Sequence, residues 1–165
     1  MTPEEIIVRR AIKELSGKHR IGLSPGMPQM LIPCLAADAC VYQLTDLSET
    51  PPRLDAIVLE AAEVTEDGFA APAFGSASAS AEADRWIALM LQTDSSGHPR
   101  IVRQRRYPAA GSVRVQLVIT EQAVVEVTDQ GLVLREIRPG VATDTVKKET
   151  RASLHVADDI KLMEL

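Results

Sequence analysis

The sequence predicts an α/β fold: a mostly parallel sheet with helices on its faces and a β-hairpin near the C-terminus. The apolar runs 55–59 and 86–91 show no polar alternation, which is the pattern of strands buried on both faces of a parallel sheet. The runs 123–127 and 132–137 are rich in β-branched residues and are separated by the turn sequence Asp129-Gln130-Gly131. That arrangement predicts a hairpin.

Length and charge limit the class of protein. The chain has 165 residues, of which 45% are hydrophobic, so we expect residues 1–165 to form one domain around a single core. A formal net charge of −5 argues against a dedicated nucleic-acid binder. The chain has no run of eighteen apolar residues, and it starts with an acidic segment rather than a leader. We therefore expect a cytoplasmic protein that binds neither nucleic acid nor a membrane.

The first helix is predicted from its capping residues. Thr2 as N-cap, Pro3 at the first helical position and Glu5 form the pattern of a capping box. Apolar side chains then recur on one face, and the helix should end at Ser16-Gly17. Its apolar face is expected to cover a sheet.

A strand, a turn rich in Gly and Pro and a second helix are expected next. The strand begins at Arg20, and the helix covers 29–37 with an interruption at Pro33, which has no N–H to donate. A strand-loop-helix order directs a helix N-terminus above the sheet, where anions are often held. On spacing alone, a simple chain reversal is the more common outcome.

The remaining elements follow the same reasoning. We expect strands at 40–44 and 113–119, an alanine-serine segment at 70–83, and a helix capped by Thr143 that runs to about Ser153.

Cysteine and histidine spacing gives no sign of a metal site. Cys34 and Cys40 are not in a CxxC spacing, and we expect buried, reduced thiols rather than redox or nucleophilic groups. The three histidines lie far apart in the sequence and share no ligand spacing with the cysteines.

The segment Arg100–Arg106 contains four arginines within seven positions. The ordinary interpretation is a half-exposed strand whose charged side faces water. The alternative is a phosphate-binding face, because guanidinium groups form paired hydrogen bonds with phosphate oxygens.

Several blocks of the chain carry a resemblance to a known family. They are 10–15, 21–31, 54–59, 64–68, 85–137 and Pro139-Gly140-Val141. These blocks resemble the β subunit of family I CoA-transferases, of the 3-oxoacid CoA-transferase type. The resemblance implies a reduced fold of the CoA-transferase (NagB/RpiA-like) type. It also makes Gly26 and Gly75 the candidates for contact with coenzyme A, since each is retained from a glycine-containing family segment.

The resemblance breaks where the family keeps its nucleophile. In the family, a glutamate in an S-E-N-G motif attacks the acyl-CoA thioester, and this chain contains no S-E-N-G. Carried over from the strand Val41-Tyr42-Gln43, the glutamate position falls on Thr45 and the Asn position on Asp46. A threonine hydroxyl is a poor replacement because it is not ionised at neutral pH. Several dozen family residues that follow are replaced by 47–53.

Other carboxylates are candidates for that role. Asp46 and Glu49 lie in the shortened loop and are expected to be ordinary loop carboxylates. Glu60 stands where the family has a Gly at a strand end. It is expected to be a paired or rim carboxylate, and if it is unpaired it suits a proton carrier better than a nucleophile.

Three functions are compatible with these observations. The first is a degenerate CoA-transferase β-subunit-like protein that is inactive in the glutamyl-CoA mechanism but still contacts acyl-CoA or an α-like subunit. The second is an active subunit that uses a substitute carboxylate or a residue from its partner. The third is a non-catalytic structural or regulatory module. No covalently bound cofactor is expected, coenzyme A or acyl-CoA would be a substrate, and the resemblance implies an α-like partner or self-association.

Overall fold

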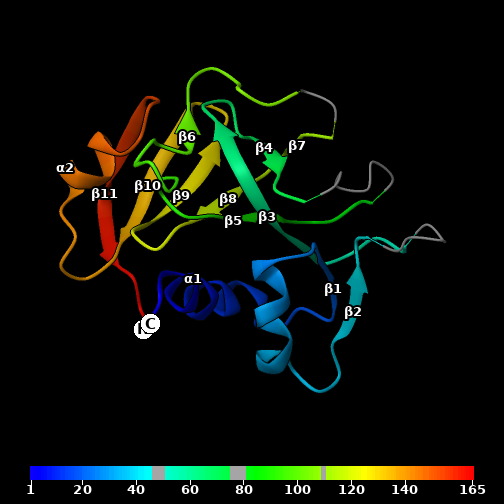
Figure 1. Ribbon diagram of the computed structural model, residues 1–165. Coiled ribbons are helices and arrows are strands. Elements are labelled where there is room, and N and C mark those ends of the chain that lie inside the picture. Colours follow the sequence, from blue (N-terminus) through cyan, green and yellow to red (C-terminus); the bar gives the residue numbers. More distant parts are fainter. Residues whose placement is uncertain (46–50, 75–80, 109–110) are drawn as a thin grey trace.

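The computed structural model describes residues 1–45, 51–74, 81–108 and 111–165. In these ranges the chain forms a mixed sheet with strand order β11-β10-β9-β8-β5-β3-β1-β2, together with short strands that pair beside β3 (Figure 1). The helices are α1 (Pro3–Ala11), η1 (Ile12–Leu15), η2 (Met27–Cys34) and α2 (Thr143–Lys148). The strands are β1 (Arg20–Leu23), β2 (Cys40–Gln43), β3 (Ala56–Thr65), β4 (Phe69–Pro72), β5 (Trp86–Leu89), β6 (Ile101–Val102), β7 (Val113–Arg114), β8 (Leu117–Ile119), β9 (Ala123–Thr128), β10 (Gly131–Ile137) and β11 (Leu154–Leu162).

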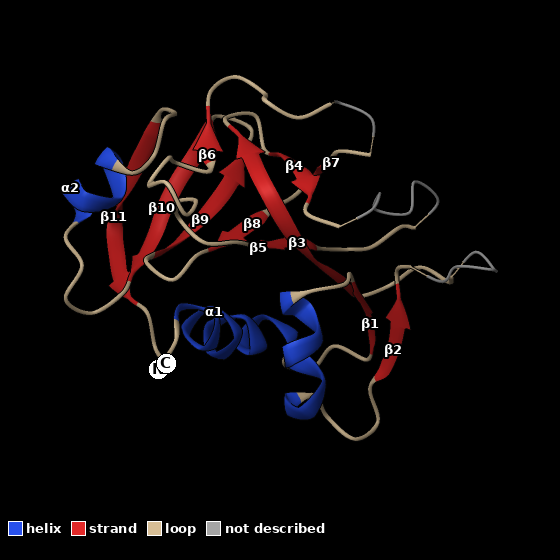
Figure 2. Ribbon diagram, viewed as in Figure 1, coloured by secondary structure: helices blue, strands red, loops and turns tan. Residues whose placement is uncertain are grey.

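The predicted fold class is confirmed. Strands β2, β1, β3, β5 and β8 pair in parallel, β9 and β10 form the antiparallel hairpin, and β11 pairs in parallel with β10. Figure 2 shows α1 and η2 on one side of the sheet, where they enclose one core. A second core lies on the opposite face and includes Val146 of α2. The central strands are thus buried on both faces, as their continuous apolar sequences predict.

The first helix starts as predicted. The Thr2 Oγ1 accepts the Glu5 N–H at 3.2 Å, and the Glu5 carboxylate accepts the Thr2 N–H at 2.8 Å. The α-helix continues as the 3₁₀ helix η1 to Leu15, close to the expected end. Arg10 joins α1 to β10 through Glu136, and this hydrogen bond raises the pKa of the Arg10 guanidinium above its ordinary value.

The second helix differs from the prediction. It is a 3₁₀ helix that begins at Met27 and ends at Cys34, with Pro33 inside its last turn. Because proline lacks the N–H that an α-helix would use there, the chain forms only short 3₁₀ turns and then extends at Leu35.

The C-terminal part also differs. Thr143 is the first helical residue rather than the cap, because the N-cap is Ala142, and α2 ends at Lys148 instead of Ser153. The Thr150 hydroxyl bonds back to the Val146 carbonyl at 2.7 Å, which closes the turn. The chain then forms β11, a long strand that sequence reasoning did not assign.

The arginine segment is not the half-exposed strand that was expected. Only Ile101 and Val102 form a strand, β6, which pairs with Val64 and Thr65 at the end of β3. The residues after Val102 do not continue the strand, but Arg106 and Tyr107 stay beside β3 because their N–H groups donate to Glu63. The arginine side chains after Val102 are exposed. The predicted strand 113–119 is likewise divided into β7 and β8.

The prediction of buried thiols is wrong, because Cys34 and Cys40 are both exposed. Cys34 ends η2, whose buried face is made by Met27, Pro28 and Leu31. Cys40 opens β2, the strand at the edge of the sheet.

The described residues contain neither a metal cluster nor a membrane span. No group of three or more His, Cys, Asp or Glu side chains in this part of the chain is placed to hold a metal ion. No helix within the described ranges is both long and apolar enough to cross a membrane.

Candidate functional site

The order of the parallel strands identifies a candidate site. From β1 the chain moves to β2 on one side and then returns to β3 on the other side of β1. In open α/β sheets, ligands bind at such a switch point, beyond the carboxyl ends of the strands. Ser24 follows β1, Thr45 follows β2, and Glu60 lies on β3 level with these ends. We call this region, formed by Ser24, Gly26, Met27, Gln29, Gln43 and Glu60, the switch-point site.

The loop after β1 is fixed to β3 through Ser24. The Ser24 N–H donates to the Val58 carbonyl at 3.0 Å, and the Ser24 Oγ accepts the Glu60 N–H at 2.9 Å. The Ser24 hydroxyl in turn donates to the carbonyl of Pro25 at 3.0 Å. Its hydrogen-bonding capacity is therefore used within the loop, and its side chain is buried.

The Glu60 carboxylate lies at the start of η2. Its Oε2 accepts the N–H of Met27, the first residue of that helix, at 2.6 Å. Gly26 allows this approach, because its φ is +89° and a Cβ there would overlap the Glu60 Oε2 and lie 2.6 Å from a ring carbon of Phe74. The anion at this helix N-terminus is thus a side chain of the protein itself.

Two glutamines close the other side of the site. The Gln29 amide donates to the Gln43 side chain at 2.7 Å and to the Ser24 carbonyl at 2.8 Å, and Gln43 donates back at 2.9 Å. This pair joins η2 to the edge strand β2. Sequence reasoning missed both glutamines, although the place of Gln43 just before Thr45 was a usable signal.

Thr45 and Glu60 share the edge of the sheet but do not meet. Gln43 and Val58 both pair with Leu23 of β1, from its two sides. Thr45 and Glu60 each lie two residues further along the chain, so they are level with each other across β1. Two strand spacings separate such positions, which is roughly 10 Å. Thr45 is exposed and Glu60 is half-buried. Gly75, Asp46 and Glu49 lie outside the described residues.

One exposed aromatic ring lies at the site. Phe74 is beside Gly26 and is 51% exposed. The described polar groups of the site bond to one another, and Glu60 is fixed by its bond to the Met27 N–H. An exposed ring beside polar groups can contact an apolar part of a ligand. Ser24 has no histidine or carboxylate among its described side-chain partners to activate it.

The predicted arginine segment lies at the C-terminal end of β3, whereas Glu60 lies in the middle of that strand. Val102 pairs with Thr65, which is five residues beyond Glu60 on the same strand. At the usual rise of a strand, this is about 17 Å from Glu60. The arginines therefore do not take part in the switch-point site.

Solved structures with the same fold identify its class. An acyl-CoA transferase (YdiF) from Escherichia coli O157:H7 superimposes with a TM-score of 0.76 over 99% of this chain and 43% of its own, at 18% identity. The same E. coli transferase has also been solved as a thioester complex with CoA, with a TM-score of 0.70 over the same shares and the same identity. The decarboxylase AibA/AibB superimposes with a TM-score of 0.75 over 99% of this chain and 89% of its own, at 15% identity. The chain therefore has the fold of CoA-transferases, which a decarboxylase shares.

Sequence comparison adds a closer, partial relationship. The chain is 39% identical over 70 residues to the β subunit of the acetate CoA-transferase of Haemophilus influenzae, covering 42% of this chain and 31% of that protein. It is 29% identical over 114 residues to the β subunit of a probable coenzyme A transferase of Bacillus subtilis, covering 63% of this chain and 52% of that protein. The matches thus span about a third to a half of these relatives, with shares of 31% and 52%. No family model matches the chain. The chain is a distant homologue of CoA-transferase β subunits.

Proposed function

We propose that this chain is a CoA-transferase β-subunit-like protein that is inactive in the glutamyl-CoA mechanism but still binds acyl-CoA. The observation that carries the proposal is the contact between the Glu60 carboxylate and the Met27 N–H, at 2.6 Å. It holds Glu60, the carboxylate among the described residues of the switch-point site, against the protein backbone. The position that the resemblance gives to the family nucleophile is Thr45, whose side chain is exposed and carries no charge.

The glutamyl-CoA mechanism requires a carboxylate that is free to attack a thioester carbonyl. To do so, Glu60 would have to leave its hydrogen bond with the Met27 N–H, at a cost of roughly 1 kcal/mol. Thr45 offers only a hydroxyl, which is not ionised at neutral pH and is a weak nucleophile without a base.

Retained binding is supported by the fold and by an exposed aromatic ring at the site. The E. coli transferase with this fold forms a thioester complex with CoA. In the present chain the exposed Phe74 ring lies beside Gly26, and it suits contact with a pantetheine arm or a short acyl chain. The β-subunit relatives and the paired naming of AibA/AibB support an α-like partner that would complete the site.

One alternative has an observation of its own. Glu60 lies in the same row of the sheet as Thr45 and at the switch point, so it is the carboxylate best placed to substitute for the family glutamate. In that case the chain would be an active subunit that transfers CoA between small carboxylic acids.

Calorimetric titration with acetyl-CoA and succinyl-CoA tests binding first. The proposal predicts a measurable heat of binding and no CoA exchange between succinate and acetoacetate after an α subunit of a 3-oxoacid CoA-transferase is added. Exchange that disappears in Glu60→Gln, but persists in the exposed control Glu164→Gln, would establish the alternative. The absence of any binding would leave a structural or regulatory module.

A further inference from the structure

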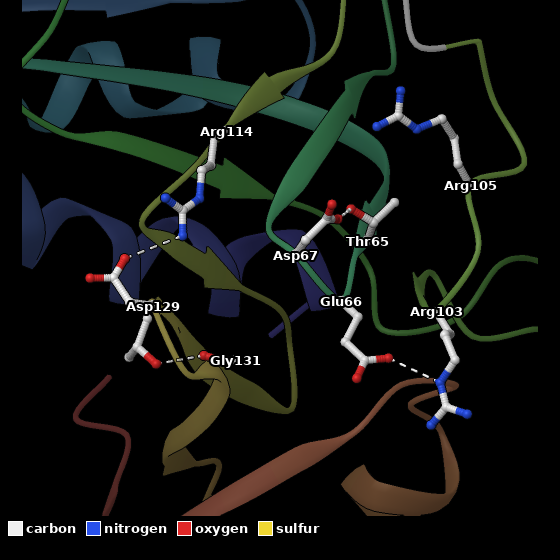
Figure 3. Close-up of a pocket in the computed structure, with 9 residues that line it drawn as sticks. Thr65, Glu66, Asp67, Arg103, Arg105, Arg114, Asp129 and Gly131 are labelled. Carbon is white, nitrogen blue, oxygen red and sulfur yellow. Dashed lines mark hydrogen bonds and ion pairs between the residues drawn. The ribbon is translucent and has the colours of Figure 1, made fainter.

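Two hollows lie on either side of the segment that follows β6. The first, shown in Figure 3, has a volume of about 480 Å³ and is lined by charged side chains of both signs. We call it the mixed-charge hollow. Its arginines are Arg103, Arg105 and Arg114, and its carboxylates are Glu66, Asp67 and Asp129.

The charges of the mixed-charge hollow are already matched. Arg103 bonds to Glu66 at 3.0 Å, and Arg114 lies 3.8 Å from Asp129. Arg105 lies over the Phe69 ring, 5.6 Å from its centroid. With equal numbers of arginines and carboxylates, this hollow has no excess of charge that would select an anion or a cation.

The second hollow has a different balance. It has a volume of about 570 Å³, and its charged lining consists of Arg103, Arg106 and Arg151 without a carboxylate. Val102 and Ala152 supply an apolar wall. We call it the arginine hollow. Figure 3 shows the Arg103 side chain extending toward the ribbon of α2 and β11, in agreement with its hydrogen bond to the Ser153 hydroxyl at 3.3 Å.

Two of these arginines are bonded to carboxylates that do not line the arginine hollow. One carboxylate belongs to β3, and the other follows it. Glu63 is 1% exposed, and it accepts the N–H of Arg106 at 2.9 Å and the Arg106 Nε–H at 3.3 Å. Glu66 accepts the Arg103 Nε–H at 3.0 Å, and this bond holds the pKa of the Glu66 carboxyl below its ordinary value. Each guanidinium carries five N–H donors, so these contacts orient it and leave others for a ligand.

The third arginine supplies charge that the lining does not neutralise. The Arg151 N–H donates to the Ile101 carbonyl at 2.9 Å, which places Arg151 beside β6. Within the described ranges its guanidinium makes no ion pair with Asp or Glu, and its side chain is exposed. Arg151 is therefore the arginine of this hollow that no carboxylate pairs in the described part of the chain, whereas Arg103 and Arg106 are paired with Glu66 and Glu63.

We propose that the arginine hollow binds the phosphate groups of an organophosphate whose organic body lies against Val102 and Ala152. Guanidinium groups form paired hydrogen bonds with phosphate oxygens, so Arg151 would supply an unpaired positive charge, and Arg103 and Arg106 would supply further N–H donors. The apolar wall favours an organic body over inorganic phosphate alone. This inference does not depend on the proposed function, because none of the residues that line the hollow belongs to the switch-point site.

Two sources of such phosphates are distinguishable by titration. One is coenzyme A, whose nucleotide end carries several phosphates, and the other is a free nucleotide or phosphorylated metabolite. Adenosine 3′,5′-bisphosphate, coenzyme A, adenosine, pantetheine and inorganic phosphate are titrated in parallel by calorimetry. The variants are Arg151→Gln and, as a matched control, Arg9→Gln, an exposed arginine on α1.

Adenosine 3′,5′-bisphosphate should bind, adenosine should not, and Arg151→Gln should weaken binding at least about tenfold while Arg9→Gln does not. If Arg151→Gln also weakens the binding of coenzyme A, the site binds the phosphates of CoA. If the binding of coenzyme A is unchanged in this variant, the site binds another organophosphate. Absence of bisphosphate binding, binding of inorganic phosphate alone, or equal binding by Arg151→Gln would overturn the proposal. Binding of the bisphosphate without binding of pantetheine, together with no heat in the titrations with acetyl-CoA and succinyl-CoA, would contradict only the proposed function.

Discussion

The middle of β3 and its C-terminal end use carboxylates in different ways. At the switch-point site, Glu60 accepts the Met27 N–H and so occupies the place where a helix N-terminus would hold an anionic ligand. At the C-terminal end, Glu63 and Glu66 bond to Arg106 and Arg103 without lining the arginine hollow, and Arg151 adds a positive charge that no carboxylate pairs in the described part of the chain. In one region a carboxylate takes the position of a ligand, and in the other it orients the groups that would bind one.

The difference follows from the donors involved. A backbone N–H offers one hydrogen bond, so one carboxylate oxygen satisfies it. An arginine offers five N–H groups in a fixed plane, so a carboxylate can occupy two of them while the rest stay available. A carboxylate beside a backbone N–H therefore closes that site to anions, whereas a carboxylate behind an arginine fixes the arginine in place.

The largest loss of stability is expected on substitution of Glu63. The change Glu63→Ala removes a carboxylate that is 1% exposed and leaves the N–H groups of Arg106 and Tyr107 without their acceptor. The free energy of unfolding, measured with urea, should fall by about 3 kcal/mol. Glu164→Gln, at a surface pair with Lys13, should change it by less than about 0.5 kcal/mol. Equal effects for the two variants would mean that Glu63 does not hold the arginine segment.

A smaller loss of stability is expected at Gly26. In Gly26→Ala a methyl group would overlap the Glu60 carboxylate at a φ of +89°, so unfolding should become easier by about 2 kcal/mol. Gly17→Ala is the matched control, because its φ is +73° but no atom lies within 4 Å of the added Cβ. It should cost only about 1 kcal/mol. The double variant Gly26→Ala, Glu60→Ala should lose less stability than the sum of the two single variants, because the overlap with the carboxylate is gone. Losses that add exactly would argue against a contact between the added methyl group and Glu60.

The pair Glu60→Ala and Glu60→Gln separates the hydrogen bond from the charge. Glu60→Ala leaves the Met27 N–H without its acceptor and should destabilise the chain by about 1 kcal/mol, while the amide of Glu60→Gln can still accept it. Only Glu60→Ala should then bind succinate more tightly than the unaltered chain, because it opens the helix N-terminus to an anion. Calorimetric titration gives the comparison. Equal succinate affinity in all three proteins would show that Glu60 does not block the position.

A pH effect is expected from Asp55, which precedes β3. The backbone N–H groups of Arg20 and His19 hold the pKa of the Asp55 carboxyl below its ordinary value. A lowered folded-state pKa means that this group stabilises the fold above its unfolded pKa of about 3.9, and that the contribution is lost as the pH falls through the lower folded value. In Asp55→Asn the unfolding free energy should therefore fall less steeply as the pH is lowered. An unchanged fall at acid pH would contradict the hydrogen bonds between Asp55 and the backbone.

Local signals predicted much of the fold from the sequence. The capping box of Thr2 and Glu5 and the hairpin around Gly131 depend on residues a few positions apart, and both form as expected. The continuous apolar runs correctly placed β3 and β5 inside a parallel sheet. The strand β11 was missed because its sequence mixes charged and apolar residues, and its pairing with β10 is a tertiary contact.

The site was predictable only in part. Glu60 was recognised as a carboxylate at a strand end, but its partner Met27 lies 33 positions earlier, so no local pattern could reveal the contact. The four arginines were recognised as a group, yet Arg151 joins two of them only because β6 lies beside the residues that precede β11. Non-local packing therefore decides which charges are matched and which remain available.

Intact-mass spectrometry after incubation with acetyl-CoA, in the presence of an α subunit of a 3-oxoacid CoA-transferase, tests the central claim directly. The claim is that this fold holds its switch-point carboxylate as an internal anion and not as a nucleophile. The account predicts that the chain keeps its unmodified mass while acetyl-CoA is bound. A covalent CoA adduct that maps to Glu60, and is absent in Glu60→Gln, would contradict it.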